Sequence, residues 1–413
     1  MYKKHVLENG LTIIGEEIPY VKSISLGIWI NAGSRMENEK ISGVSHFIEH
    51  MLFKGTKNRT SKQIASEIDN LGGVINAFTS KECTCYYVKL LDSHIDIGID
   101  VLSDMILNST FKEDDLDKER SVIIEELKMY EDSPEDLAYD LLTENVYKND
   151  PLGMNIIGTE SSLKGLNREN LLEYFNKYYV PNNSVISISG NFNFDDIVKK
   201  IEEKFKYWKK REINIDIKKA EFKSCFLIKN KDIEQVNLAM SLEAIPLEND
   251  KEVYALAVIN TVFGGSISSR LFQRIREEKG LVYSIYSSQS LYRKCGELGI
   301  FASMSNENLK EVYDLILEEI KYIKKHYLTD KEIEESKEQL KGSYILGLES
   351  TSSKMMSIGR SLLLNNKVES SDDILKSIDS VDKETIKQVI DKIFNLEKLG
   401  VCIVGRDVDK EQL

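Results

Sequence analysis

The chain has 413 residues, enough for two or three domains, and its 41% hydrophobic and 30% charged residues are ordinary for a globular protein. A net charge of −13 disfavours nucleic acid and anionic membrane surfaces, which bind basic proteins. No apolar run approaches the ~20 residues of a membrane span, and the start, MYKKHVLENGLTII, resembles neither a secretory signal nor an Arg- and Ser-rich transit sequence.

The cysteines give a further indication of the compartment. There are five, an odd number, and none forms a C-x-x-C pair. We therefore expect no structural disulfides and a cytoplasmic location. Together with the charge and the short apolar runs, this predicts neither membrane nor nucleic acid as a partner. The cysteines are Cys83, Cys85, Cys225, Cys295 and Cys402.

Strands and helices alternate along the first half. Period-two alternation, clearest in ISLGIWI, predicts strands, and apolar residues at helical spacing predict helices. The expected strands are 11–15, 24–30, 74–91 and 185–189. The expected helices start near 43 and 61, with Ser61 as N-cap, and continue as 95–107, 114–129, 136–147, 170–178 and 195–205.

The second half repeats the first after a polar, charged stretch at 209–221 that looks like a linker. GVSHFIEHMLFKG, from Gly43, aligns with VYALAVINTVFGG, from Val253, at an offset of 210. This repeat predicts two homologous α+β domains, 1–212 and 213–413, each a mostly antiparallel sheet with helices on one face. In the second copy the positions of His46, Glu49 and His50 hold Leu256, Ile259 and Asn260, so that copy is expected to bind no metal.

The H-x-x-E-H motif at His46, Glu49 and His50 is the strongest chemical signal in the chain. On a helix the two histidines share one face, where they can hold one zinc ion, and the glutamate lies beside them as a general base must. The alternative is a chance pair of histidines on an amphipathic helix. The apolar neighbours predict a buried helix, however, and burying these groups without a partner would be costly. The inverted motif is a known zinc-peptidase signature.

A second acidic segment, ERSVIIEE, lies on the predicted helix 114–129. Glu119 and Glu126 are seven residues apart and share a face. A run of acids on a helix is usually solvated. Here Val122 and Ile123 lie among them, so some of the acids must point inward or flank an apolar stripe.

Several stretches together resemble the pitrilysin, insulysin and mitochondrial processing peptidase family of inverted-motif zinc peptidases. They are HFIEHMLFKGT, GGVINAFTS, ERSVIIEE, YYVPNN and SRLFQRIREEKGLVY, and the resemblance covers the whole chain. The length is similar to that of the processing-peptidase branch rather than the double-length insulysin branch. The glycine-rich loop of the family's non-catalytic processing subunit is absent.

The resemblance implies a role for each acidic residue near the motif. It makes Glu126 the third metal ligand beside His46 and His50, with Glu119 supporting the site and Glu49 as general base. Glu125, one residue from Glu126, would point about 100° away. Two histidines and one glutamate leave a position for water, which is the catalytic pattern. We expect one Zn²⁺ per chain, although the residues alone do not separate zinc from manganese or cobalt.

The resemblance also implies substrate contacts. Asn76, Ala77 and Phe78 match the family's edge strand, on which an extended peptide pairs its backbone; the alternative is an ordinary core strand. Arg276 and Tyr283 match a pair in the metal-free domain that contacts substrate near the scissile bond and can donate to a developing oxyanion. An isolated arginine in an R-E-E-K run is otherwise a solvated charge.

The expected function is that of a zinc endopeptidase for peptides or unfolded segments. In double-length relatives four domains enclose a chamber, so the resemblance implies a homodimer here, with Arg276 and Tyr283 completing the partner's site. The rival reading is a non-catalytic assembly subunit of the same fold, like the family's respiratory core proteins. A different hydrolase on this fold is a third.

Overall fold

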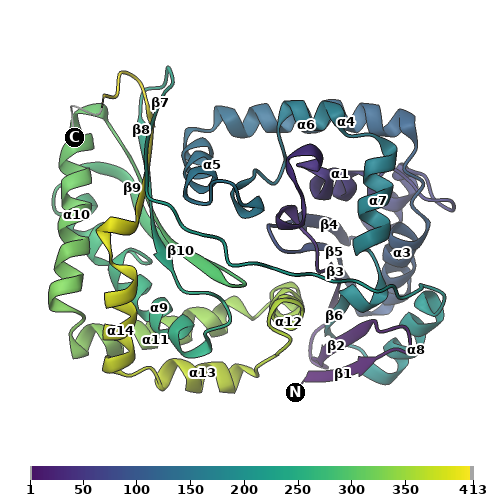
Figure 1. The fold of residues 1–413 in the computed structure, drawn as a ribbon. Coiled ribbons are helices and arrows are strands. Elements are labelled where there is room, and N and C mark those ends of the chain that lie inside the picture. The colour runs from purple at the N-terminus through teal and green to yellow at the C-terminus, as the bar shows by residue number, and fades with distance from the viewer. Residues whose placement is uncertain (1, 410–413) are drawn as a thin grey trace. The chain divides into compact units, whose positions relative to one another are not determined.

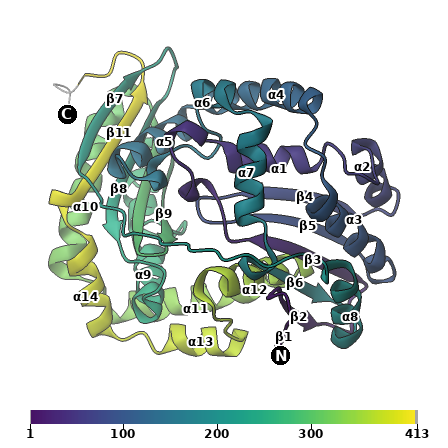
Figure 2. The ribbon, with the colours of Figure 1, turned by 45° about the vertical axis from the view of Figure 1, so that its right-hand side comes forward.

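The computed structural model describes residues 2–409, which fold into two compact α+β units (Figures 1 and 2). Unit 1 comprises the chain up to Leu127, Met154–Asp216 and Leu346–Ser370; unit 2 comprises Lys128–Gly153, Ile217–Ile345 and the chain from Ser371. The predicted α+β class is confirmed. Each unit thus contains a short segment from the opposite half of the sequence.

Unit 1 is built on a sheet of six strands, counted over residues 2–409, in the order β1-β2-β6-β3-β5-β4. All neighbouring strands are antiparallel except β2 and β6. The strands are β1 (Tyr2–Val6), β2 (Thr12–Glu17), β3 (Ser23–Ile30), β4 (Val74–Thr79), β5 (Thr84–Leu91) and β6 (Ser184–Gly190). The helices are α1 (Val44–Leu52), α2 (Ser61–Asp69), α3 (Ile95–Asn108), α4 (Glu113–Asp132, in this unit up to Leu127), α6 (Glu160–Gly165), α7 (Arg168–Tyr178), α8 (Phe194–Phe205) and α12 (Thr351–Asn365).

Both faces of this sheet are covered, which explains why β3 is buried along nearly its whole length. One face packs its aliphatic residues into the main core of the unit with α1, α3 and α7. The other face lies against α12, and small residues allow the close approach (Figure 2). A Cβ on Gly27 would lie 2.5 Å from Met355 Sδ, and one on Gly359 would lie 2.1 Å from Trp29 Nε1.

Unit 2 has a five-stranded sheet, within the described residues, in the order β7-β11-β8-β10-β9. In this sheet, as described, β7 and β11 pair in parallel and the other neighbouring strands are antiparallel. The strands are β7 (Cys225–Asn230), β8 (Val236–Ala244), β9 (Val282–Tyr292), β10 (Cys295–Met304) and β11 (Leu399–Gly405). The helices are α5 (Pro134–Val146), α9 (Asp250–Phe263), α10 (Leu309–His326), α11 (Asp330–Gly347, in this unit up to Ile345), α13 (Ser371–Asp379) and α14 (Lys383–Ile393).

The second sheet repeats the strand order of the first. β7-β11-β8-β10-β9 corresponds to β2-β6-β3-β5-β4, including the single parallel pair. In α9, Leu256 and Ile259 occupy the positions of His46 and Glu49 and are fully buried among apolar side chains. The repeat seen in the sequence is therefore present in the topology, with a hydrophobic core where the first copy has its H-x-x-E-H helix.

Helices α5 and α12 occupy equivalent places in the two copies of the repeat, and each packs on the sheet of the opposite copy. α12 lies on β2, β3 and β6 within unit 1, and α5 lies on β7, β8 and β11 within unit 2 (Figure 2). The sequence predicted helices on one face of each sheet. The structure adds this helix on the other face.

The expected linker contains no helix or strand, and residues 208–224 form an irregular connection. The boundary between the units, at Asp216 and Ile217, falls within it. Among the helices of residues 2–409, none is long and apolar enough to cross a membrane.

Candidate metal centre

Helix α1 carries the H-x-x-E-H motif, and a buried carboxylate fixes its first turn. Gly43, just before the helix, has a φ of +90°, and a Cβ there would lie 2.3 Å from Ile157 O, so glycine is required. Glu37 Oε2 accepts a hydrogen bond from Gly43 N–H at 2.7 Å, and Oε1 accepts one from Ser45 N–H at 2.8 Å. This carboxyl group accepts hydrogen bonds from backbone donors at the start of the helix that would otherwise be unpaired.

Helix α4 brings its two predicted glutamates to the histidines of α1. Glu126 Oε2 lies 3.4 Å from His50 Nε2 and 3.8 Å from His46 Nε2. Glu119 Oε2 lies 3.0 Å from His50 Nδ1, the opposite edge of the same ring. One potential ligand atom each from His46, His50 and Glu126 lies within 4.8 Å of the others, whereas Glu125 is exposed.

The environment favours the protonation state that a metal needs at His46 and Glu126, and the opposite state at His50. Burial, with the neighbouring charge of His50, lowers the pKa of His46 to about 4, so its imidazole is neutral at pH 7. Burial also acts to lower the pKa of His50, but hydrogen bonds to Glu126 and Glu119 outweigh it and raise the pKa. The hydrogen bond with His50 lowers the pKa of Glu126. Burial raises the pKa of Glu49.

The donor set therefore fits a divalent metal such as zinc. Two imidazole nitrogens and one carboxylate oxygen are the ligands of catalytic zinc sites, which keep a further position open. Glu119 would hold His50 with Nδ1–H donating to the carboxylate and Nε2 directed at the metal, the usual support for a ligating histidine.

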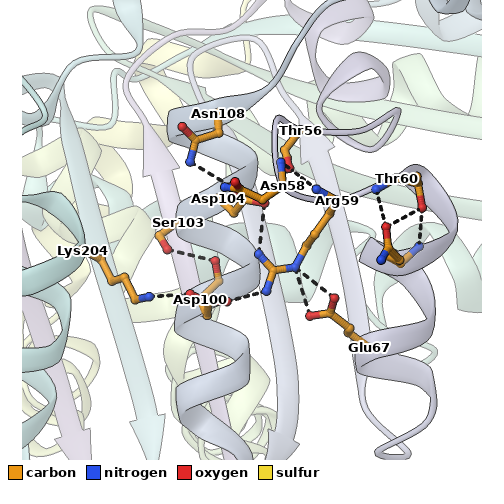
Figure 3. Close-up of polar contacts among 11 residues, drawn as sticks. Thr56, Asn58, Arg59, Thr60, Glu67, Asp100, Ser103, Asp104, Asn108 and Lys204 are labelled. Atoms are coloured by element: carbon orange, nitrogen blue, oxygen red, sulfur yellow. Dashed lines mark hydrogen bonds and ion pairs between the residues drawn. The ribbon is translucent and has the colours of Figure 1, made fainter.

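The loop that follows α1 is fastened to α3 by an arginine cluster (Figure 3). Arg59 donates to Asp104 Oδ2 at 3.0 Å and to both oxygens of Glu67 at 3.1 and 3.0 Å, and it also pairs with Asp100. Asp104 is buried and in addition accepts hydrogen bonds from Thr56, Asn58 and Asn108. Thr60, rather than the expected Ser61, caps α2, in a capping box with Gln63.

Glu49 points from α1 towards strand β4. Thr79, the last residue of β4, donates its hydroxyl to Glu49 Oε2 at 2.5 Å. Among the described residues β4 pairs with β5 alone and so forms an edge of the sheet. Glu49 is thus in direct contact with β4, the edge strand of the unit 1 sheet.

The predicted substrate residues lie on this strand. Asn76 is exposed, and its Oδ1 accepts a hydrogen bond from Ala77 N–H at 2.8 Å. Ala77 packs partly into the core. The ring of Phe78 packs edge-on against Trp29, with centroids 5.6 Å apart, so this side chain contributes to packing on the α12 face.

The remaining predicted residues belong to unit 2. Arg276 lies on η6 (Phe272–Glu277), a single turn of π-helix of the kind often found at functional sites, and its guanidinium lies over the Phe272 ring, 4.7 Å from the centroid. Tyr283, near the start of β9, is 77% exposed. Their roles remain predictions.

Sequence reasoning missed three residues that contact the site. The carboxyl of Glu37 accepts hydrogen bonds from the backbone at the start of α1, and the hydroxyl of Thr79 donates to Glu49. The third residue is Lys54, whose Nζ lies 2.5 Å from Glu119 Oε1. Thr79 and Lys54 lie inside motifs that carry the family resemblance, and Glu37 follows the turn at 31–34. Their positions gave no indication of which side chain they contact.

Two family models match the chain. One, described as insulinase (peptidase family M16), matches residues 12–160, and the other, described as the peptidase M16 inactive domain, matches residues 165–340. The uncharacterized zinc protease YmxG of Bacillus subtilis is 42% identical over 394 residues, covering 95% of this chain and 96% of its own. An uncharacterized zinc protease of Rickettsia felis is 35% identical over 402 residues, 97% of each chain.

Solved structures agree with the fold. A protease from Helicobacter pylori superposes with a TM-score of 0.89 at 21% identity, covering 98% of this chain and 99% of its own. A structure from Pseudomonas fluorescens described as a peptidase M16 inactive domain gives 0.91 at 19% identity, covering 98% of each chain.

The fold is shared with proteins described as M16 peptidases, and the His46, His50 and Glu126 cluster is of a kind that can hold a zinc ion. The chain belongs to peptidase family M16, the insulinase family.

Proposed function

We propose that this protein is a zinc-dependent endopeptidase acting on peptides or unfolded segments. The observation that carries the proposal is the convergence of His46, His50 and Glu126 with Glu49 beside them. A zinc ion held by these three ligands supplies a polarised scissile carbonyl and a water of lowered pKa. The relatives' names, zinc protease, support the same class.

The chain's own residues supply the remaining steps. Glu49 takes a proton from the attacking water and passes it to the leaving amine, and its raised pKa suits both transfers. Glu119 fixes the orientation of His50. The peptide extends along β4, where Asn76 releases Ala77 N–H so that this donor can pair with the peptide backbone.

The wider arrangement is also part of the proposal. Two copies of the chain form a symmetric dimer around a chamber, each binding one zinc, and Arg276 and Tyr283 complete the partner's site. The support is that the second copy of the repeat has Leu256 and Ile259 where ligand and base would stand. Within residues 2–409 the cysteines form no disulfide, which suits a cytoplasmic location.

The test combines metal analysis with hydrolysis of an unstructured fluorogenic peptide. Wild-type protein should contain zinc and cleave, and a chelator should abolish cleavage until zinc is returned. Glu126→Gln should lose metal, while Glu125→Gln, its exposed neighbour on α4, serves as control and should keep it.

Glu49→Gln separates binding from chemistry. It should retain zinc and lose at least ~100-fold in kcat, because the general base is gone. A wild-type protein that binds zinc but cleaves no peptide would instead support the non-catalytic assembly subunit.

A further inference from the structure

Thr79 is neither a candidate metal ligand nor the candidate base, yet its side chain contacts the base directly. Its hydroxyl donates to Glu49 Oε2 at 2.5 Å, across thirty residues of sequence. Among residues 2–409, it is the side chain that hydrogen-bonds to Glu49. The contact engages one carboxylate oxygen and leaves Oε1 available for proton transfer.

The pleat of β4 determines which way Thr79 points. Ile75 and Ala77 pack against the main core of unit 1, on the face where β4 contacts α1. Thr79 is the next residue in the same alternation, so it also points towards α1. A hydroxyl on this face has a hydrogen-bonding requirement, and Glu49 meets it.

The turn after Thr79 is held rigidly. Ser80 N–H donates to Cys83 O at 2.8 Å, and Ser80 O accepts from Ser34 N–H at 3.2 Å. A Cβ on Gly33 would lie 2.1 Å from Ser80 O, so the two segments are in close contact. Thr79 is therefore presented from a fixed strand end rather than from a mobile loop.

We propose that Thr79 is a positioning residue that sets the orientation of the Glu49 carboxylate and links it to the strand on which the peptide docks. This rests on the proposed function, in which Glu49 is the general base. A glutamate side chain has three rotatable bonds, so a single fixed donor selects one arrangement among several. Pairing of a peptide with β4 would hold Thr79, and with it the base, in place for reaction.

The test replaces the hydroxyl without changing the shape of the side chain. Thr79→Val should lower kcat roughly 10- to 100-fold, as for other groups that orient catalytic residues, while zinc content is kept. KM should change by less than about threefold, because the strand's backbone is unaltered. Thr79→Ser, which restores the donor, should recover kcat to within about threefold of wild type.

Thr84→Val is the matched control. Thr84 is the cross-strand partner of Thr79, and its hydroxyl donates to Ala32 O at 2.9 Å rather than to Glu49. It removes a threonine hydroxyl from the same strand pair, so it should lower the melting temperature but leave kcat unchanged.

Crystal structures of the metal-free wild type and Thr79→Val provide a readout that needs no activity. The Glu49 carboxylate should be ordered in the wild type and displaced or split in the variant. A carboxylate that keeps its place in Thr79→Val overturns the proposal, as does a wild-type kcat. If wild-type protein cleaves nothing, the proposed function fails, and the crystal comparison still decides whether Thr79 positions Glu49.

Discussion

Glu37 is a buried acid whose ionisation is coupled to folding. Burial raises the pKa of its carboxyl to about 7, against the opposing hydrogen bonds from Ser45 and Gly43 and the charge of Lys81. An unfolded glutamate titrates near ~4.3. Between these values the folded state holds the extra proton, so the Glu37 contribution to stability is complete at low pH and decreases as pH rises towards 7.

Glu37→Gln should remove this pH dependence. The wild-type free energy of unfolding minus that of the variant should fall by on the order of 3 kcal/mol between pH 4.5 and 8, measured by urea denaturation of metal-free protein. Glu39→Gln, an exposed change in the same segment, should follow the wild type throughout. A difference that stays constant with pH would mean that Glu37 folds in its ionised form.

The residues of the site were predictable to different degrees. His46, Glu49 and His50 follow from spacing alone, because a helix turns that spacing into one face. Glu126 and Glu119 lie more than sixty residues away and needed the family resemblance. Thr79 and Glu37 could not be found, since their roles depend on which oxygen a folded strand or turn brings within reach.

At the scale of elements, the arginine cluster that follows α1, here called the arginine clamp, has a counterpart after α9. Arg59 pairs with Asp104 of α3, and Arg270 pairs with Glu319 of α10 at 3.2 Å and with Glu332 of α11 at 2.8 Å. An arginine cluster of this kind is thus present also in the copy that lacks the H-x-x-E-H residues. We infer that it serves the fold, by tying the loop after the first helix to the helix behind it.

Arg59→Met should therefore destabilise the protein. The variant leaves the buried Asp104 without its cation, at a cost of about 3 kcal/mol in the free energy of unfolding. Lys204→Met removes a half-exposed partner of Asp100 and should cost under ~1 kcal/mol. Denaturant titration of both variants gives the comparison, and equal losses would show that the clamp adds little beyond a surface ion pair.

The elements themselves were largely predictable, and their assignment to sheets was not. The expected helix 95–107 is α3, and the expected helix 114–129 lies within α4. The period-two pattern of β3 suggested one buried face, yet both are buried. Gly27 and Trp29 on the second face meet α12, more than three hundred residues away, and no local pattern specifies that partner.

At the scale of the whole molecule, the proposed dimer places each site's residues on two chains. Glu49→Gln and Arg276→Ala chains, each weak or inactive alone, should complement when mixed. With equal amounts and free exchange, half the dimers are mixed and each has one intact site, so about a quarter of wild-type activity should return.

Mixing Glu49→Gln with Glu126→Gln is the control for this complementation. Both changes affect the same group of residues, so no mixed dimer contains an intact site and no activity should return. If the Arg276→Ala mixture also stays inactive after subunit exchange is demonstrated, Arg276 acts on the zinc of its own chain or outside the site.

Each copy of the repeat supplies a helix, α5 or α12, to the sheet of the other copy, and this bears on whether either half of the chain is structurally complete. The segment 208–224 separates the two halves of the sequence. A chain that ended there would lack α12, the helix that covers Trp29 and Gly27. The remaining half would lack α5, leaving Ala239, Cys402 and Val404 uncovered. Neither half of the sequence therefore contains all the helices that cover its own sheet. Each sheet is covered by a helix from the other half of the sequence, which is a physical reason for the chain to keep both copies when only the first carries the H-x-x-E-H residues.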